Sequence, residues 1–325
     1  MTVLRGIVCA GNWIVDIVHN IPAWPAKSDL VVISNQSVGV GGGAANVAFN
    51  LAALKVDYPV LPAGLLGTDA YADTVLNACK AAGLPVDNLN VVQDLGTAHT
   101  HVMNVPGDSR TFFYFAGAND HLSGQTLSLD TIVSQQPRIF YLGYLTLMPI
   151  LDAVGPDGYT GAYHLLAQAR QAGMLTCVDL VSSSTDSYAQ TVAGTLAEID
   201  WLFLNETEAS RATGIAVDGE EDRANMLRAA EHLMSGGLRQ GCILHTPKLS
   251  LWKTRDQEMW FDVPQIPKAE VVSPVGAGDA FAAGILHGLH EGWQPQESVQ
   301  LGNKMAAACL RASTATGGVS ALSDL

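Results

Sequence analysis

Short runs of apolar residues alternate with longer amphipathic stretches along most of this 325-residue chain. The runs are typical of strands buried on both faces of a sheet, and the amphipathic stretches are long enough for helices. The predicted strands cover residues 5–10, 60–65, 139–142, 175–179, 201–204 and 242–245. The predicted helices cover residues 44–54, 69–82, 161–172, 221–235, 278–291 and 296–312. The alternation predicts an α/β fold with a mostly parallel central sheet and helices on both faces.

Two segments, residues 30–38 and 98–115, instead alternate polar and apolar side chains, which predicts a small sheet apart from the main one. Ligands of α/β proteins bind at the carboxyl ends of the strands, where insertions collect. We therefore expect a lid contributed by about residues 13–38 and 97–117. The other interpretation is an edge hairpin packed on the core. No repeat or long linker interrupts the chain, which predicts a single domain over residues 1–325.

Composition narrows the possible partners and the cellular compartment. The chain carries 17 basic and 31 acidic residues, a net charge of −14, which disfavours binding to nucleic acid or to an anionic membrane surface. The five cysteines are dispersed without pairing logic, as is typical of reduced thiols in a cytoplasmic protein. The first residues predict a strand rather than an export signal. We therefore expect a cytoplasmic protein that binds neither nucleic acid nor membranes.

A glycine-rich segment, residues 39–46, precedes the first predicted helix. Glycines let a ligand approach the backbone, and the helix that follows offers a positive amino end. Gly39, Gly41 and Ala44 also fit a dinucleotide-binding fingerprint, with Asp57 eighteen residues after Gly39. That interpretation needs a hydrophobic strand before the glycines, but polar and apolar residues alternate there. A nicotinamide-dependent dehydrogenase is therefore disfavoured.

A second glycine-rich segment, residues 275–284, begins a predicted helix with small residues. The free N–H groups at such a helix start form an anion-binding site. Asp279 lies in the first turn, where a carboxylate can simply cap the helix. The same arrangement suits phosphoryl transfer to a hydroxyl group, because the carboxylate takes the proton while backbone N–H groups stabilise the transferring charge.

A third candidate site follows the predicted strand at residues 201–204. Asn205 and Glu208 are three residues apart, so both face the same way at a helix start. Oxygen ligands at the carboxyl end of a strand suit Mg²⁺, which keeps several of its waters. The alternative is an asparagine cap followed by solvated glutamates.

Together these segments resemble the ribokinase (PfkB) family of carbohydrate kinases. The chain carries GGGAANVAFN from residue 41, NETE from residue 205 and PVGAGDAFAAG from residue 274, in the family's order and spacing. The early AGNWIVDI is similar to the family's first strand with its sugar-binding aspartate. The resemblance covers about residues 5–318. It implies a three-layer α/β/α sandwich with a small β-sheet lid, often shared in a homodimer.

The resemblance also implies an activity and its residues. The reaction is ATP-dependent transfer of the γ-phosphate to a hydroxymethyl group of a sugar or sugar-like molecule. Asp279 is similar to the catalytic base, and Gly276, Ala277 and Gly278 resemble the anion hole. The positions that hold substrate hydroxyl groups match Asn12, Asp16, Gly42, Gly43 and Asn46. Asn205 and Glu208 match the motif that organises Mg²⁺, through water, and the phosphates. Nucleotide binding is implied for Asn205, Gly276, Gly278 and Asn303.

Two departures from the family pattern concern ion and nucleotide binding. Ser273 stands where the family has an aspartate that commonly serves a monovalent-cation site, which leaves potassium activation open. Residues 242–251 differ from the family's strand followed by T-x-G-x-x-G, since His245, Pro247 and Ser250 replace the threonine and both glycines. Proline lacks an N–H group, so this loop cannot present its backbone to phosphates in the usual way. Lys248 is then the residue expected to supply a charge there.

Two alternatives stay open. The form G-N-x-x-x-D-I at residues 11–17 is similar to adenosine kinases, whereas ribokinase-like members have a second asparagine where Ile14 stands. A nucleoside is therefore the alternative substrate. The altered loop at residues 242–251 also admits a catalytically degenerate binding protein, against which the intact GAGD segment argues.

Overall fold

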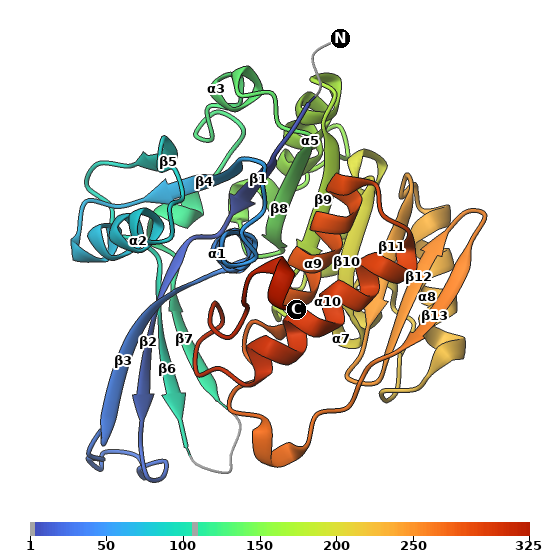
Figure 1. Cartoon of the computed structure of the whole chain (residues 1–325). Helices are drawn as coiled ribbons and strands as arrows, with labels where there is room; N and C mark the ends of the chain where they lie inside the picture. The colour runs from blue at the N-terminus through green and yellow to red at the C-terminus, as the bar shows by residue number, and fades with distance from the viewer. Residues whose placement is uncertain (1–3, 106–109) are drawn as a thin grey trace.

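The computed structural model describes residues 4–105 and 110–325, and a large sheet forms its centre (Figure 1). Within these ranges, nine strands lie in the order β13-β12-β11-β10-β9-β8-β1-β4-β5. They are β1 (Ile7–Gly11), β4 (Val60–Leu66), β5 (Asn88–Val91), β8 (Ile139–Leu145), β9 (Leu175–Leu180), β10 (Trp201–Asn205), β11 (Gly241–His245), β12 (Leu249–Thr254) and β13 (Glu258–Asp262). Neighbouring strands from β5 to β11 are parallel, and β12 and β13 add an antiparallel edge.

Helices cover both faces of this sheet because alternate strand residues enter two different hydrophobic cores. Ile7 and Cys9 pack with α1, α2, α9 and α10, whereas Val8 and Ala10 pack with α5, α7 and α8. The helices are α1 (Gly43–Ala53), α2 (Ala70–Ala81), α3 (Leu129–Ser134), α4 (Pro149–Asp152), α5 (Gly161–Gln171), α6 (Tyr188–Ala193), α7 (Glu206–Thr213), α8 (Arg223–Ser235), α9 (Ala277–Glu291) and α10 (Pro295–Leu310). Because both faces of each central strand are buried, the sequence of each strand is a nearly continuous hydrophobic run.

A smaller sheet projects from one end of the molecule (Figure 1), with the strand order β3-β2-β6-β7. Its strands are β2 (Ile14–Asn20), β3 (Asn35–Gly41), β6 (His99–Asn104) and β7 (Thr111–Phe115). Chain order places this sheet beside the carboxyl end of β1, because β2 follows β1 directly and β3 leads into α1. Asp16, Thr100 and Tyr114 lie opposite one another across β2, β6 and β7, so they share one face.

The predicted fold class is confirmed, as is the type of each predicted strand and helix of the central layer. Boundaries differ by up to three residues. The prediction of sheet structure from residue 30 is wrong for residues 30–34, because β3 pairs with β2 only from Asn35 onward. The strand β5 and several short helices were missed because they carry too few residues for a clear period. The strands β12 and β13, which form the antiparallel edge of the sheet, were also missed. In the ranges described, no helix has the length and apolar character needed to cross a membrane.

Candidate active site

Asp279 is buried at the start of α9, where residues from two other elements reach it. The Nδ2 group of Asn46 in α1 donates a hydrogen bond of 2.8 Å to Asp279 Oδ2. The hydroxyl group of Tyr144 in β8 donates a second bond, of 3.0 Å, to the same oxygen. The fold thus brings together two predicted site residues that are 233 positions apart, and it adds a tyrosine that the sequence analysis missed.

The surroundings of Asp279 shift the pKa of its carboxyl group. Burial raises the pKa of Asp279 to about 7, and the charges of Glu208 and Asp16 act in the same direction. The hydrogen bonds from Asn46 and Tyr144 lower it. A general base works best when its pKa lies near the working pH. Asp279 is therefore suited to accept a proton near neutral pH.

The start of α9 has the geometry of an anion-binding site. Gly276 is the N-cap residue with a φ of 83°, and a side chain there would collide with Ala315, so this position requires glycine. Ala277 is the first helical residue. Within the part of the chain that the structure describes, the N–H groups of Gly278 and Asp279 make no backbone hydrogen bond. Such unpaired groups at a helix start favour a phosphate.

The small sheet contributes Asp16 to the same region. Burial raises the pKa of Asp16 to about 6, while a hydrogen bond from Thr100 and the charge of Arg110 lower it. A side chain at Gly41 would collide with the Asp16 carboxylate. The glycine-rich segment therefore leaves room for Asp16 beside the start of α1.

Buried amide atoms without partners mark the space between these carboxylates. Among the described residues, Asn12 Nδ2 and Asn46 Oδ1 are buried and have no hydrogen-bond partner in the structure. Asn12 Oδ1 faces the Tyr114 hydroxyl at 3.5 Å, a weak contact. Buried polar groups are rarely left unpaired, so a polar ligand is the natural partner for both amides.

Gly42 and Gly43 have packing roles at this site. Gly42, the N-cap of α1, has a φ of 92°, and a side chain there would collide with the backbone of Asn12. A Cβ atom on Gly43 would lie 2.5 Å from the ring of Tyr144. These glycines keep Asn12, Tyr144 and α1 close together, and direct contact of either glycine with substrate stays a prediction.

Asn205 and Glu208 form a reciprocal cap on α7. Glu208 N–H donates to Asn205 Oδ1 at 2.9 Å, and Asn205 N–H donates to Glu208 Oε2 at 2.9 Å. Glu208 Oε1 accepts a 3.0 Å bond from the hydroxyl of Ser182. Glu208 is buried, which raises its pKa, rather than solvated as the capping alternative assumed. The two residues thus cap the helix and also hold a carboxylate near Asp279.

Asp179, at the carboxyl end of β9, is a site residue that the sequence analysis missed. It is buried, and the side-chain hydrogen bond that it accepts in the described structure comes from the Tyr141 hydroxyl at 3.2 Å. Burial raises its pKa well above the usual range, and the charges of Asp279 and Glu208 add to the effect. An acidic residue that ends an apolar run, as in VDL, is the signal that could have identified it.

This acidic region fits Mg²⁺ bound chiefly through water and phosphate oxygens. The charges of Asp279 and Glu208 raise the pKa of Asp179, and the charge of Glu208 raises the pKa of Asp279, so a cation bound among them would be stabilised. Across residues 4–105 and 110–325, no group of three or more histidine, cysteine or acidic side chains is arranged to hold a metal ion. Mg²⁺ commonly takes only one or two carboxylates and completes its shell with waters and substrate phosphates.

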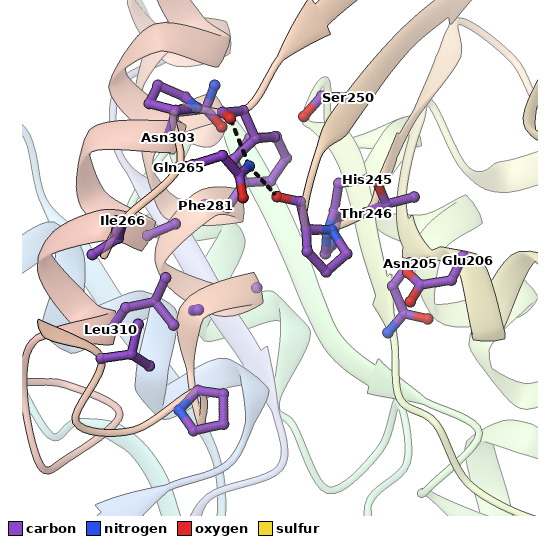
Figure 2. A pocket seen from close by; sticks show the side chains of 18 of the residues that line it. Asn205, Glu206, His245, Thr246, Ser250, Gln265, Ile266, Phe281, Asn303 and Leu310 are labelled. Carbon is purple, nitrogen blue, oxygen red and sulfur yellow. Dashed lines mark hydrogen bonds between the residues drawn. The ribbon is translucent and has the colours of Figure 1, made fainter. Parts of the chain in front are cut away.

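A cavity of about 410 Å³ lies next to the start of α9 and is shown in Figure 2. Its lining includes Asn205, Gly278 and Asn303, three of the residues predicted to bind nucleotide. The rest of the lining has more apolar than polar residues and comes from α7, α9, α10, β11, β12 and the loops at residues 246–247, 263–266 and 271–274. Its volume is in the range typical of small-molecule sites. The buried hydroxyl of Ser250 lines this cavity without a hydrogen-bond partner among the described residues.

The altered loop places its side chains in different surroundings. His245 packs against the ring of Phe281, with ring centroids 5.2 Å apart, and burial lowers its pKa to about 4. Lys248 is outside the cavity lining, and its ammonium group lies 3.6 Å from Glu220 and 3.4 Å from Glu221. Lys248 could therefore contact a phosphate only after these surface ion pairs break, and its role in nucleotide binding stays a prediction. Gly276 is likewise outside the lining.

The family assignment follows from comparison with known proteins. The pfkB family carbohydrate kinase profile matches residues 5–321, so the chain belongs to this family of kinases. The resemblance drawn from the motifs is thereby confirmed, and the chain is a carbohydrate kinase in the sense of that family.

Individual relatives share about a quarter of their sequence with this chain. It is 24% identical to the deoxyribokinase of Salmonella typhi, over 86% of this chain and 84% of that protein. It is 24% identical to the ribokinase of Arabidopsis thaliana, over 94% of this chain and 76% of the relative. A crystal structure of the Arabidopsis thaliana ribokinase with ribose and ATP superposes with a TM-score of 0.79 at 22% identity, covering 98% of this chain and 96% of the other. That likeness confirms the ribokinase fold.

Proposed function

We propose that this protein transfers the γ-phosphate of ATP to a hydroxymethyl group of a sugar or sugar-like molecule, with Asp279 as the general base. The observation that carries the proposal is the position of Asp279. It lies in a helix start whose unpaired N–H groups adjoin the cavity, and it bonds to Asn46. Among the described residues, Asn46 Oδ1 and Asn12 Nδ2 are buried without a partner, which suits a polyhydroxy ligand.

The acceptor is held from the side of the small sheet. Asp16, Asn12 and Asn46 offer carboxylate and amide atoms that bond to hydroxyl groups, and Gly42 and Gly43 set their spacing. With its hydroxymethyl group next to Asp279, the acceptor loses its proton to the carboxylate as the new oxygen–phosphorus bond forms.

The nucleotide occupies the cavity, with its phosphates toward Gly278 and its base and ribose toward Asn303. Backbone N–H groups at the start of α9, from Gly276 through Asp279, then stabilise the charge that develops on the transferring phosphoryl group. Because these groups are fixed in the helix start, they need no rearrangement during the reaction.

Asn205 and Glu208, together with Asp179, would hold Mg²⁺ through its waters. The ion, when bound, neutralises charge on the nucleotide phosphates. The capping box keeps Glu208 in one orientation, and Ser182 fixes its second oxygen. The role of Asn205, Glu208 and Asp179 is thus to provide oxygen atoms that are already in position before the ion binds.

The small sheet is assigned the role of a lid within a single ribokinase-like domain. Residues 13–38 and 97–117 carry the exposed apolar side chains Val32, Ile33, Phe112 and Phe113. Closure of this sheet over the acceptor would exclude water from the transfer. We also propose that the exposed apolar side chains pair two copies of the chain in a homodimer, and that the protein is cytoplasmic, in keeping with five buried free cysteines.

The experiment that tests this function is ATP consumption in the presence of Mg²⁺ against a panel of aldoses, ketoses, sugar acids and nucleosides. Wild-type protein is compared with Asp279→Ala as the blank. A sugar that is phosphorylated by the wild type alone supports the proposal. Preference for adenosine over the sugars establishes the nucleoside alternative. Absence of ATP consumption with every compound, together with no ATP binding, supports the alternative of a catalytically degenerate binding protein.

A further inference from the structure

Tyr144 has an unusual backbone conformation for a large side chain. Its φ is 65°, in the left-handed region that non-glycine residues seldom adopt. It lies where the pairing of β8 with β9 changes register, between Leu142 and Leu145. Strained backbone of this kind persists only where the surroundings hold it, and it clusters at active sites.

The surroundings of Tyr144 hold the ring in one place. Gly43 leaves the space that the ring fills, because a Cβ atom there would lie 2.5 Å from Tyr144 Cδ1. Both neighbouring partners come from segments that the sequence analysis linked to function, the glycine-rich start of α1 and the first turn of α9. The ring thus packs between them and sends its hydroxyl group to Asp279.

The hydroxyl group acts on one oxygen of the carboxylate. Tyr144 and Asn46 both donate to Asp279 Oδ2, at 3.0 and 2.8 Å. Among the described residues, no hydrogen bond to Oδ1 is present. Two donors on one oxygen fix the plane of the carboxylate and leave the other oxygen available.

We propose that Tyr144 is a positioning residue for phosphoryl transfer, holding Asp279 in its charged form with Oδ1 turned toward the acceptor hydroxyl. This inference rests on the proposed function. In the step itself, the acceptor proton passes to Asp279 Oδ1 and the acceptor oxygen bonds to the γ-phosphorus. The bond from that phosphorus to the bridging oxygen breaks, and ADP leaves with its electron pair. Tyr144 keeps its own proton, because burial and the charge of Asp279 raise its pKa well above the usual range.

The variant Tyr144→Phe tests the hydroxyl group alone, because phenylalanine keeps the ring that packs on Gly43. The carboxyl titration of Asp279 is followed by ¹³C NMR on protein labelled at aspartate, with Asp279→Asn identifying the resonance. Loss of a donor to the carboxylate disfavours the charged form, so we expect the pKa of Asp279 to rise by about one unit. We expect the acid limb of kcat/KM for the best acceptor of the panel to move by the same amount, and kcat to fall about tenfold, with acceptor KM within about threefold of wild type.

The matched control is Tyr58→Phe. Tyr58 donates or accepts a bond of the same 3.0 Å length with His287, also on α9 but eight positions beyond Asp279. This variant should leave the Asp279 titration and the acid limb unchanged. An unchanged Asp279 pKa in Tyr144→Phe overturns the inference, as does a shifted pKa with unchanged kcat. Since the NMR titration needs no substrate, its result is separate from failure of the proposed function, which would instead appear as full activity in Asp279→Asn.

Discussion

The proposed acceptor site and the proposed nucleotide cavity adjoin the same helix start, but they are built differently. On the acceptor side, Asn46 and Tyr144 both donate to Asp279, and among the described residues Asn12 Nδ2 and Asn46 Oδ1 are buried without a partner. The cavity lining has more apolar than polar residues, although it includes the polar side chains of Asn205, Thr246, Ser250, Gln265 and Asn303. Hydrogen bonds fix direction, whereas apolar contact depends mainly on buried area. We therefore expect the proposed acceptor site to specify the geometry of the reaction.

The same contrast explains where the sequence departs from its family. The glycine-rich segment borders the proposed acceptor site, the GAGD helix start lies between that site and the cavity, and both segments are intact. The loop at residues 242–251 borders the cavity, and there His245, Pro247 and Ser250 replace the usual residues. His245 lies 3.7 Å from the position of a Cβ atom on Gly278 and packs on Phe281, so it fills space beneath the helix start.

The largest effect is expected from Asp279→Asn. Asparagine keeps the shape and the acceptor oxygen for Asn46 and Tyr144 but cannot take a proton, so kcat should fall on the order of 10³-fold. Release of ADP in a coupled assay measures the loss. Binding of magnesium-saturated ATP, measured by calorimetry, should stay within threefold, because the cavity is untouched. Activity above a tenth of the wild-type value would show that another group is the base.

Asp16→Asn should affect the kinetic constants of the acceptor but not the KM for ATP. The change removes a charge that accepts hydrogen bonds from substrate hydroxyls, so kcat/KM for the acceptor should fall about 30-fold. The KM for ATP should stay near the wild-type value. Initial rates with each substrate varied in turn measure both constants. Equal increases in the two KM values would mean that Asp16 supports the fold of the site rather than the acceptor.

The pH dependence should also differ between the two sides. The pKa values of Asp279 and Asp16, about 7 and about 6, are raised, so both groups gain protons as the solution is acidified through this range. Acceptor kcat/KM should then fall about tenfold per unit below pH 7, and more steeply below pH 6. His245, with a pKa lowered to about 4, stays neutral throughout. The affinity for magnesium-saturated ATP should therefore change little from pH 6 to 8. A parallel fall in this affinity and in acceptor kcat/KM would contradict the difference between the two sides.

The sequence predicted the order of elements and most of the candidate site, since both depend on local patterns. Apolar runs and helix starts are read within a few residues, and the GAGD segment identifies the first turn of α9. The meeting of Asn46 with Asp279 could be expected only through the family resemblance, because the two residues are 233 positions apart.

Tyr144 and Asp179 show what local patterns miss. Both lie near the ends of apolar strands, where Tyr144 looks like an ordinary core residue and Asp179 is a single acidic residue outside any motif. Tyr144 gains its role from a left-handed backbone conformation that no propensity predicts, and Asp179 from the carboxylates that the fold places around it. From the sequence, a simple helix cap at Asn205 and Glu208 and the Mg²⁺ motif implied by the resemblance were alternatives. In the structure the two residues cap the helix, and the Glu208 carboxylate is also buried.

The smallest predicted effect concerns the hydroxyl group of Ser250 in the cavity. It is buried and has no hydrogen-bond partner in the described structure, a state that costs free energy until a ligand supplies one. Ser250→Ala should therefore raise the Tm of the free protein by about 2 °C. The same change should raise the KM for ATP about threefold, because the bound nucleotide loses a partner, while the acceptor KM stays unchanged. Thermal unfolding measures the Tm, and initial rates with each substrate varied in turn measure the two KM values.

Ser298→Ala provides the matched control for that prediction. Ser298 is equally buried, but its hydroxyl group donates a 3.1 Å bond to the carbonyl oxygen of Gln294, outside the cavity. Removing a satisfied hydroxyl should lower the Tm and leave both KM values unchanged. If Ser250→Ala lowers the Tm as Ser298→Ala does, the Ser250 hydroxyl already has a partner in the free protein. The cavity would then recognise the nucleotide by apolar contact and backbone groups alone, which would make the contrast with the acceptor side sharper still.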